Sequence, residues 1–265
     1  MADNNYFNGN YGNAADHAAL DAEQAEKERQ ARSTATVLAT TSAAVHTSFD
    51  NLPTDVAGGA LTTDEKFNMI IGAMLLYGFA VNAILCFVLK DFIIEGLSPV
   101  AMMVIYIVGV IAGMVICRKA KSAVVGFIGY NLIVVPMGIF LTPLLSLYNI
   151  GTIRYAFCVM GVCMMLMIGL AHLYPQFFLS IGRMLLSCLI IGIVGELIMW
   201  CVGLSSGLFD FLFIGIFMAY IGYDWAMAQR VNKTTTNAIC CAYMIYVDLI
   251  NLLVRLLRIL SKNRD

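Results

Sequence analysis

Charge is scarce in this chain: only 12% of its 265 residues are Asp, Glu, Lys or Arg, while 60% are hydrophobic. A soluble domain has about a quarter charged and about half apolar residues, so water cannot be the main solvent of this protein. A basic excess is also lacking, because the formal net charge at pH 7 is -1. A face that binds nucleic acid needs surplus Lys and Arg to displace counterions, so we expect no nucleic-acid partner.

Paired-cysteine motifs and a signal peptide are missing as well. All eight cysteines lie within apolar stretches and none forms a Cys-x-x-Cys pair, which indicates small packing residues. The first residues do not combine a basic segment with an apolar core, so we expect no cleavable signal peptide. We also expect no bound cofactor.

The composition divides the chain in two. Residues 1–62 are rich in Ala, Asn, Asp and Thr and contain no long apolar run. We expect a polar, flexible tail there, in which residues 14–32 can form a surface helix and residues 34–63 are a flexible linker. Residues 63–265 are expected to form a transmembrane domain.

Seven apolar runs fill this domain, separated by short polar loops. A bilayer core needs about 20 apolar residues per helix. Unpaired backbone groups are not tolerated in hydrocarbon, and no run alternates as a barrel strand would, so the runs predict helices. The predicted spans are residues 67–89, 99–117, 123–147, 155–174, 184–204, 208–228 and 238–260.

Basic residues in the loops predict the orientation of these spans. The loops after the second and sixth spans are basic, and the positive-inside rule places them, with the N-terminus, in the cytoplasm. A seven-span count then puts the basic C-terminal end outside, so either the rule fails there or the last helix does not cross fully. The residues concerned are Arg118, Lys119, Lys121, Arg230 and Lys233 in the loops, and Arg255, Arg258, Lys262 and Arg264 at the C-terminal end.

Four acidic residues lie within predicted spans: Glu196, Asp210, Asp224 and Asp248. A charge at the middle of a span costs about 2.5 to 3.5 kcal/mol on insertion scales, so each acid needs a reason. Asp210 lies close to the start of its span, where it can cap the helix or reach the interface, and we expect a structural role. Glu196 is a candidate buried acid, protonated and bonded to neighbouring backbone, for which structural and functional readings are equally open.

Asp224 and Asp248 lie on consecutive antiparallel spans joined by a short loop. Side chains tilt toward the N-terminus of their own helix, which moves the two carboxyl groups toward the same depth. Two carboxyl groups in a low dielectric cannot both ionise cheaply, so we expect them to share a proton and to respond to pH as a pair. When deprotonated, their oxygens are transient ligands suited to Ca²⁺. The alternative is that each aspartate separately bonds a backbone group or a tyrosine hydroxyl.

Asp248, Asn251, Arg255 and Arg258 form a polar stripe on the last predicted helix, at i, i+3, i+7 and i+10. A helix that faces lipid would not carry such a stripe. We therefore expect the last helix to lie at the centre of the bundle, with Asn251 and Arg255 lining a path or a polar interface.

The run 246–260 (YVDLINLLVRLLRIL) resembles the C-terminal signature of the Bax inhibitor-1 family, also called the transmembrane Bax inhibitor motif family. Residues 222–225 and 138–148 resemble its sixth-span Tyr-Asp element and its third-span segment. The resemblance implies seven helices in two three-helix layers around a central C-terminal helix. It also implies a pH-sensitive Ca²⁺ leak in which Asp224 and Asp248 are the sensor. Arg118 matches an arginine that latches onto the sixth-span aspartate in bacterial relatives, although a positive-inside loop explains it equally well.

These observations favour a pH-sensitive, calcium-permeable leak channel and not an enzyme. The alternative is a non-conducting membrane regulator or scaffold that binds a membrane protease or a cell-death factor. An intramembrane aspartyl protease fits poorly, because residues 245–248 read Ile-Tyr-Val-Asp and not Gly-x-Gly-Asp. A seven-span receptor would rest on helix count alone. The expected partners are the lipid bilayer and Ca²⁺, and the expected location is a bacterial cytoplasmic membrane, with eukaryotic endomembranes as the alternative.

Overall fold

The fold is helical throughout the described part of the chain. A computed structural model describes residues 9–49, 61–202 and 207–262, and within them every regular element is a helix. Seven of the helices are long and apolar enough to cross a membrane, which confirms the predicted all-α membrane fold. The elements are α1 (Gly9–Phe49), α2 (Asp64–Ala83), the π-helical turn η1 (Ile84–Val88), α3 (Lys90–Gly96), α4 (Pro99–Lys119), α5 (Ala123–Leu145), α6 (Ile150–Leu173), α7 (Pro175–Cys201), α8 (Leu208–Ala228) and α9 (Thr235–Lys262).

The boundaries of the predicted spans agree closely with these helices except at the starts of α6 and α7. Helix α6 begins at Ile150 and not at the predicted residue 155, and α7 begins at Pro175, well before the predicted start at residue 184. The predicted span starts directly after Arg183, which lies inside the helix. Pro175 instead starts the helix, since its fixed φ and missing N–H suit the first turn.

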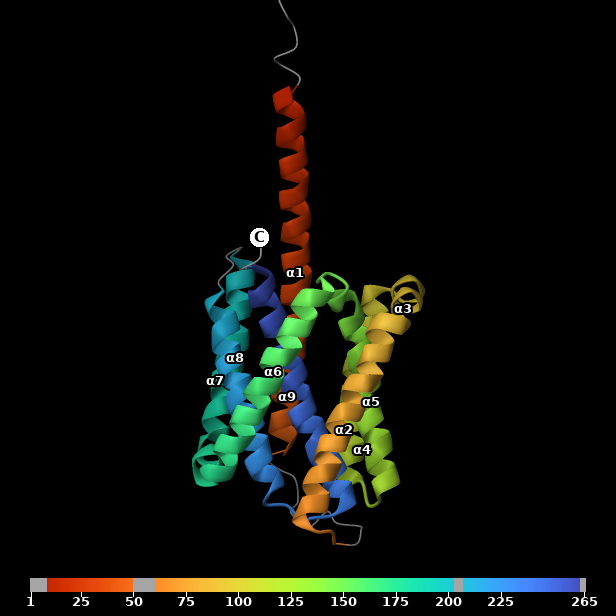
Figure 1. The fold of residues 1–265 in the computed structure, drawn as a ribbon, viewed down its shortest axis with the longest axis vertical. Coiled ribbons are helices and arrows are strands. Elements are labelled where there is room, and N and C mark those ends of the chain that lie inside the picture. Colours follow the sequence, from red (N-terminus) through yellow and green to blue (C-terminus); the bar gives the residue numbers. More distant parts are fainter. Residues whose placement is uncertain (1–8, 50–60, 203–206, 263–265) are drawn as a thin grey trace, which may run out of the picture.

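Two layers of three helices enclose α9 (Figure 1), as the family resemblance implies. Helices α2, α4 and α5 pack together on one side, and α6, α7 and α8 pack together on the other. Helix α9 contacts both layers. Every residue in an apolar 18-residue stretch of α9 is buried, whereas only 22% of the corresponding stretch of α6 is buried. The outer helices turn apolar faces toward lipid, whereas α9 is surrounded by protein and can therefore carry polar side chains.

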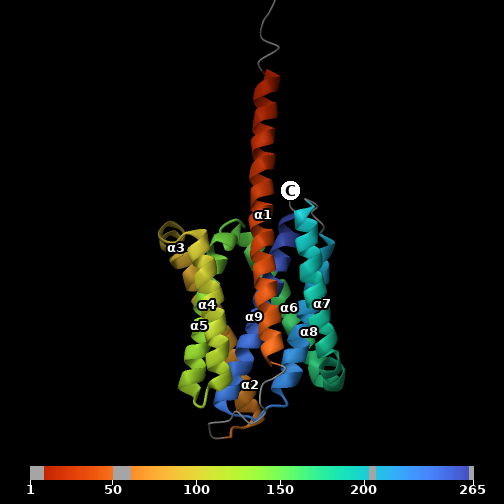
Figure 2. The same cartoon turned by 180° about the vertical axis from the view of Figure 1, so that it is seen from behind.

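The second half of helix α1 is the part that the sequence did not lead us to expect. A surface helix was predicted over residues 14–32, but the prediction of a flexible linker over residues 34–63 is wrong for residues 34–49, which continue the helix. The part of that prediction over residues 50–60 lies outside the described residues. The second half of α1 lies between the two layers and contacts α4, α5, α7 and α9 (Figure 2). It covers the side of α9 that the two layers leave open.

Small residues explain how α1 fits against the bundle. Ala31, Ala35 and Ala39 recur every four residues and are all buried, so the backbone of α1 can approach its neighbours closely. Leu38 and Val45 are fully buried on the same helix. The prediction failed because this packing face is made of alanine and hydroxyl residues and not of a long apolar run.

Three hydroxyl side chains on α1 form hydrogen bonds within the helix. Thr36, Thr40 and Thr47 each donate a hydrogen bond to a backbone carbonyl of α1. Residues 33–49 contain no Asp, Glu, Lys or Arg. This half of α1 can therefore lie at the depth of the membrane spans without a charge to desolvate.

The two ends of the described chain lie at the same end of the bundle. The first half of α1 projects from the bundle beside the end of α9 (Figure 1), and residues 18–29 on it are exposed. The basic loops after α4 and α8 lie at the opposite end. The sequence argument placed the start of the chain and these loops on one side, but α1 runs back through the bundle and separates them. The side that faces the cytoplasm stays a prediction.

Replacing Ala39 by Leu should lower the stability of the protein. The added methyl groups have no space on the buried face of α1, and overpacking of this kind costs about 1 to 3 kcal/mol. Thermal unfolding in detergent measures the effect. Ala44→Leu is the matched control, because Ala44 lies on the exposed face of the same helix. Equal unfolding midpoints for the two variants would contradict the docked position of α1.

Candidate functional site

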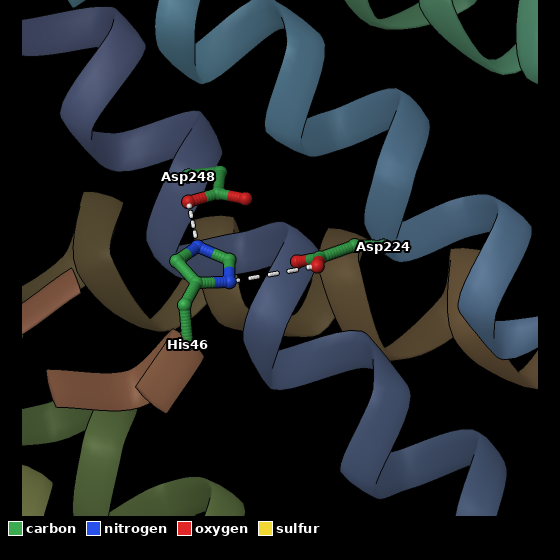
Figure 3. A group of neighbouring side chains, drawn as sticks. All are labelled: His46, Asp224 and Asp248. Carbon is green, nitrogen blue, oxygen red and sulfur yellow. Dashed lines mark hydrogen bonds and ion pairs between the residues drawn. The ribbon is translucent and has the colours of Figure 1, made fainter. Parts of the chain in front are cut away.

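Asp224 of α8, Asp248 of α9 and His46 of α1 meet at the centre of the bundle (Figure 3). His46 Nε2 lies 3.0 Å from Asp248 Oδ1, and His46 Nδ1 lies 3.7 Å from Asp224 Oδ1. One ligand atom from each residue lies within 4.8 Å of the others. All three side chains are buried. The structure therefore brings the two predicted aspartates together and adds an imidazole between them.

Their positions follow from consecutive antiparallel helices. Helices α8 and α9 pack along their lengths and are joined by a short connection, as the sequence predicts. In a helix the Cα–Cβ bonds tilt toward the N-terminus, so an aspartate near the end of α8 and one in the middle of α9 lean toward one another. The expectation that both carboxyl groups lie at one depth agrees with this geometry.

Neighbouring side chains contact His46 and the carboxyl group that it faces. Ser42, one turn earlier on α1, donates a hydrogen bond to Asp248 Oδ1 at 3.2 Å. The ring of Tyr220 stacks on the imidazole with centroids 3.7 Å apart and an interplanar angle of 16°. Ser42 and His46 lie on one face of α1 because residues four apart share a helix face.

Sequence reasoning missed His46 because the residue lies in a segment taken for a linker. A signal was present in the same segment. Alanines spaced by four residues are followed, on the same face, by Ser42 and His46. That spacing is typical of a helix that packs closely and presents polar groups to a partner.

A second buried polar cluster lies further along α9. Arg255 binds Glu196 of α7 through two hydrogen bonds of 2.7 and 2.8 Å and contacts Asp210 of α8 at 3.1 Å. Arg258 contacts Asp210 at 2.9 Å and Glu196 at 3.3 Å. The guanidinium of Arg255 also lies 4.0 Å from the centroid of the Phe213 ring. Two acids and two arginines thus form a closed, charge-balanced network.

This network corrects two expectations. Glu196 was a candidate buried acid that could be protonated and bonded to backbone; it is buried, but it forms a bidentate pair with Arg255, which is typical of an ionised carboxylate. Asp210 was predicted to cap its helix or to lie at the interface, but it is buried and bridges Arg255 and Arg258. The prediction failed because the arginine partners come from the last helix, far away in the sequence.

The remaining candidates have different positions. Asn251 is buried and donates its amide to the carbonyl of Val247 on its own helix, so it lies between the two polar clusters without joining them. Arg118 lies at the end of α4, and within the described residues no ion pair joins it to Asp224. Asp224 faces His46 instead, so the latch that the resemblance implies for Arg118 is not formed in this conformation.

The fold and this site define a class of protein: an α-helical, multi-pass membrane protein with an intramembrane aspartate pair at its central helix. The family model described as "Inhibitor of apoptosis-promoting Bax1" matches residues 63–265, and the chain therefore belongs to the Bax inhibitor-1 family. Comparison with curated proteins gives no match. The matched residues contain both aspartates and both arginine-paired acids, whereas α1 with His46 lies outside them.

Replacing Arg255 by Met should destabilise the protein strongly. Glu196 and Asp210 would then share one arginine in a buried site, and removal of one partner from a buried ion pair costs about 3 to 5 kcal/mol. The unfolding midpoint in detergent measures this loss. Arg154→Met is the control, since Arg154 is an exposed arginine of α6. A midpoint as high as that of the control would show that the cluster does not hold α7, α8 and α9 together.

Proposed function

We propose that this protein is a calcium-permeable leak channel of the membrane whose conductance responds to pH through the Asp224/Asp248 pair. The observation that carries the proposal is the position of the pair: two buried carboxyl groups meet on facing helices at the centre of a membrane bundle. Membership of the Bax inhibitor-1 family supports it.

The chemistry of the pair suits both parts of the proposal. Two carboxyl groups at short distance in a low dielectric resist ionising together, so their charge changes in coupled steps with pH. When both are deprotonated they supply hard oxygen ligands, which Ca²⁺ prefers. In this mechanism Ca²⁺ is the permeating ion and not a resident cofactor.

A cavity at one end of the bundle supports an entrance for ions, and the arginine–acid cluster lies between it and the pair. A cavity of about 420 Å³ lies where α1 leaves the bundle, and its lining includes Arg32, Asn149, Asp210 and Arg258. The arginine–acid cluster closes its inner end, and Asn251 lies between this cluster and the aspartates. If ions take this route, the charge-balanced cluster has to open for them to pass.

Calcium influx into liposomes tests the proposal. Purified protein would be reconstituted with a Ca²⁺ indicator inside, and influx recorded from about pH 5 to about pH 8, so that coupled changes in the charge of the pair can be followed. We expect the wild-type flux to change across this range. Asp224→Asn and Asp248→Asn should each flatten the response. An asparagine amide does not take up or release a proton in this range, so the coupled pair is lost.

Asp91→Asn is the matched control, since Asp91 is an exposed aspartate on the short helix α3. The control should keep the wild-type pH profile. A wild-type profile in both site variants, or no flux in any of the proteins at any pH, would refute the channel.

A second candidate is a membrane regulator that binds a protein partner, and the projecting half of α1 favours it. Residues 18–29 are exposed on a helix that extends beyond the bundle. Deleting residues 1–30 removes this projection and leaves the docked residues of α1 in place. Loss of a co-purifying partner with unchanged flux would assign the projection to binding, whereas an unchanged set of partners would argue against it.

A further inference from the structure

The imidazole of His46 occupies the space between two carboxyl groups on different helices (Figure 3). Its Nε2 faces Asp248 at 3.0 Å and its Nδ1 faces Asp224 at 3.7 Å. A Ca²⁺ ion held by both aspartates needs their oxygens at about 2.3 to 2.6 Å from its centre. The ring and such an ion cannot occupy this space together.

The docking of α1 at this site is specific. Besides His46, Ser42 binds Asp248 and Thr41 shares a hydrogen bond with Tyr106 of α4. The imidazole also stacks on Tyr220 of α8. These contacts join α1 to both helix layers and to α9, so residues 31–49 are a segment of this chain that fits the site.

Helix α1 also covers the aspartates. It fills the side of α9 between the two layers (Figure 2), and Asp248 and Asp224 are almost completely buried with α1 in place. Departure of α1 would uncover the polar face of α9, including Asp248. Movement of α1 would therefore remove His46 from between the aspartates and also expose them.

We propose that α1 is a tethered inhibitor of the di-aspartate site: docking of residues 31–49 and binding of a divalent cation between Asp224 and Asp248 exclude one another. The inference rests on the proposed function, because it concerns regulation of the same site. Competition of this kind is reciprocal: docked α1 weakens cation binding, and a bound cation favours the undocked helix by the same factor.

The ring geometry distinguishes this competition from a site in which His46 is itself a ligand. A single metal ion takes one imidazole nitrogen, with the other nitrogen bonded elsewhere. Here the two nitrogens face different aspartates, so the ring replaces an ion and does not complete its ligand set. A metal site shared by all three residues would require the imidazole to rotate away from one carboxyl group.

Calcium binding to the full-length protein in lipid nanodiscs tests the proposal. Isothermal titration with Ca²⁺ alone would compare wild type with His46→Ala at one pH. We expect His46→Ala to bind Ca²⁺ at least about fivefold more tightly, the lower end of typical coupling between linked sites. Thr40→Ala is the control on the same helix, since the Thr40 hydroxyl bonds only the carbonyl of Thr36, and it should match wild type. Equal or weaker binding by His46→Ala, or no binding by either protein, would overturn the proposal.

Hydrogen–deuterium exchange gives a second readout in the unmodified protein, so it does not depend on a variant that folds. Saturating Ca²⁺ should speed amide exchange in residues 31–49 and leave the amides of α5 unchanged. Asp248→Asn should abolish this effect of Ca²⁺. Unchanged exchange in residues 31–49 at saturating Ca²⁺ would overturn the inference.

Neither measurement depends on ion flux, so each of the two proposals can be refuted without the other. Competition between α1 and Ca²⁺ in a protein that passes no Ca²⁺ would refute the channel and keep the inhibitor. A pH-dependent flux with no competition would keep the channel and refute the inhibitor.

Discussion

A polar group inside a membrane must find its partners within the protein, because hydrocarbon offers none. Helix α9 carries Asp248, Asn251 and Arg255 in its membrane-crossing part, and it is enclosed on every side as a consequence. The two helix layers cover most of its surface and α1 covers the rest. The other helices thus surround α9 and shield its polar side chains from lipid.

The two polar clusters on α9 differ in charge balance, and this difference separates their roles. Around Arg255, two acids meet two arginines, so the charges of this cluster balance without an added proton. Around Asp248, two acids meet a single imidazole. A balanced network holds helices together, whereas an unbalanced site can take up a proton or a cation and so can respond to its surroundings.

Helix α1 gives this chain a component outside the family match. Its projecting half is polar and exposed, while its docked half combines small residues, hydroxyl groups and one histidine. The absence of Asp, Glu, Lys and Arg from residues 33–49 lets this half enter the bundle, where small residues allow close packing.

The sequence by itself determined the seven spans, the central place of the last helix and the meeting of Asp224 with Asp248, because long apolar runs, a polar stripe and helix geometry are local properties. Only the tertiary structure decided the partners of the buried charges. Glu196 and Asp210 pair with Arg255 across large sequence separations, and no local pattern encodes that choice. The position of His46 was also a tertiary outcome, since a helix of alanine and threonine gains its place from close packing against a finished bundle and not from hydrophobicity of its own.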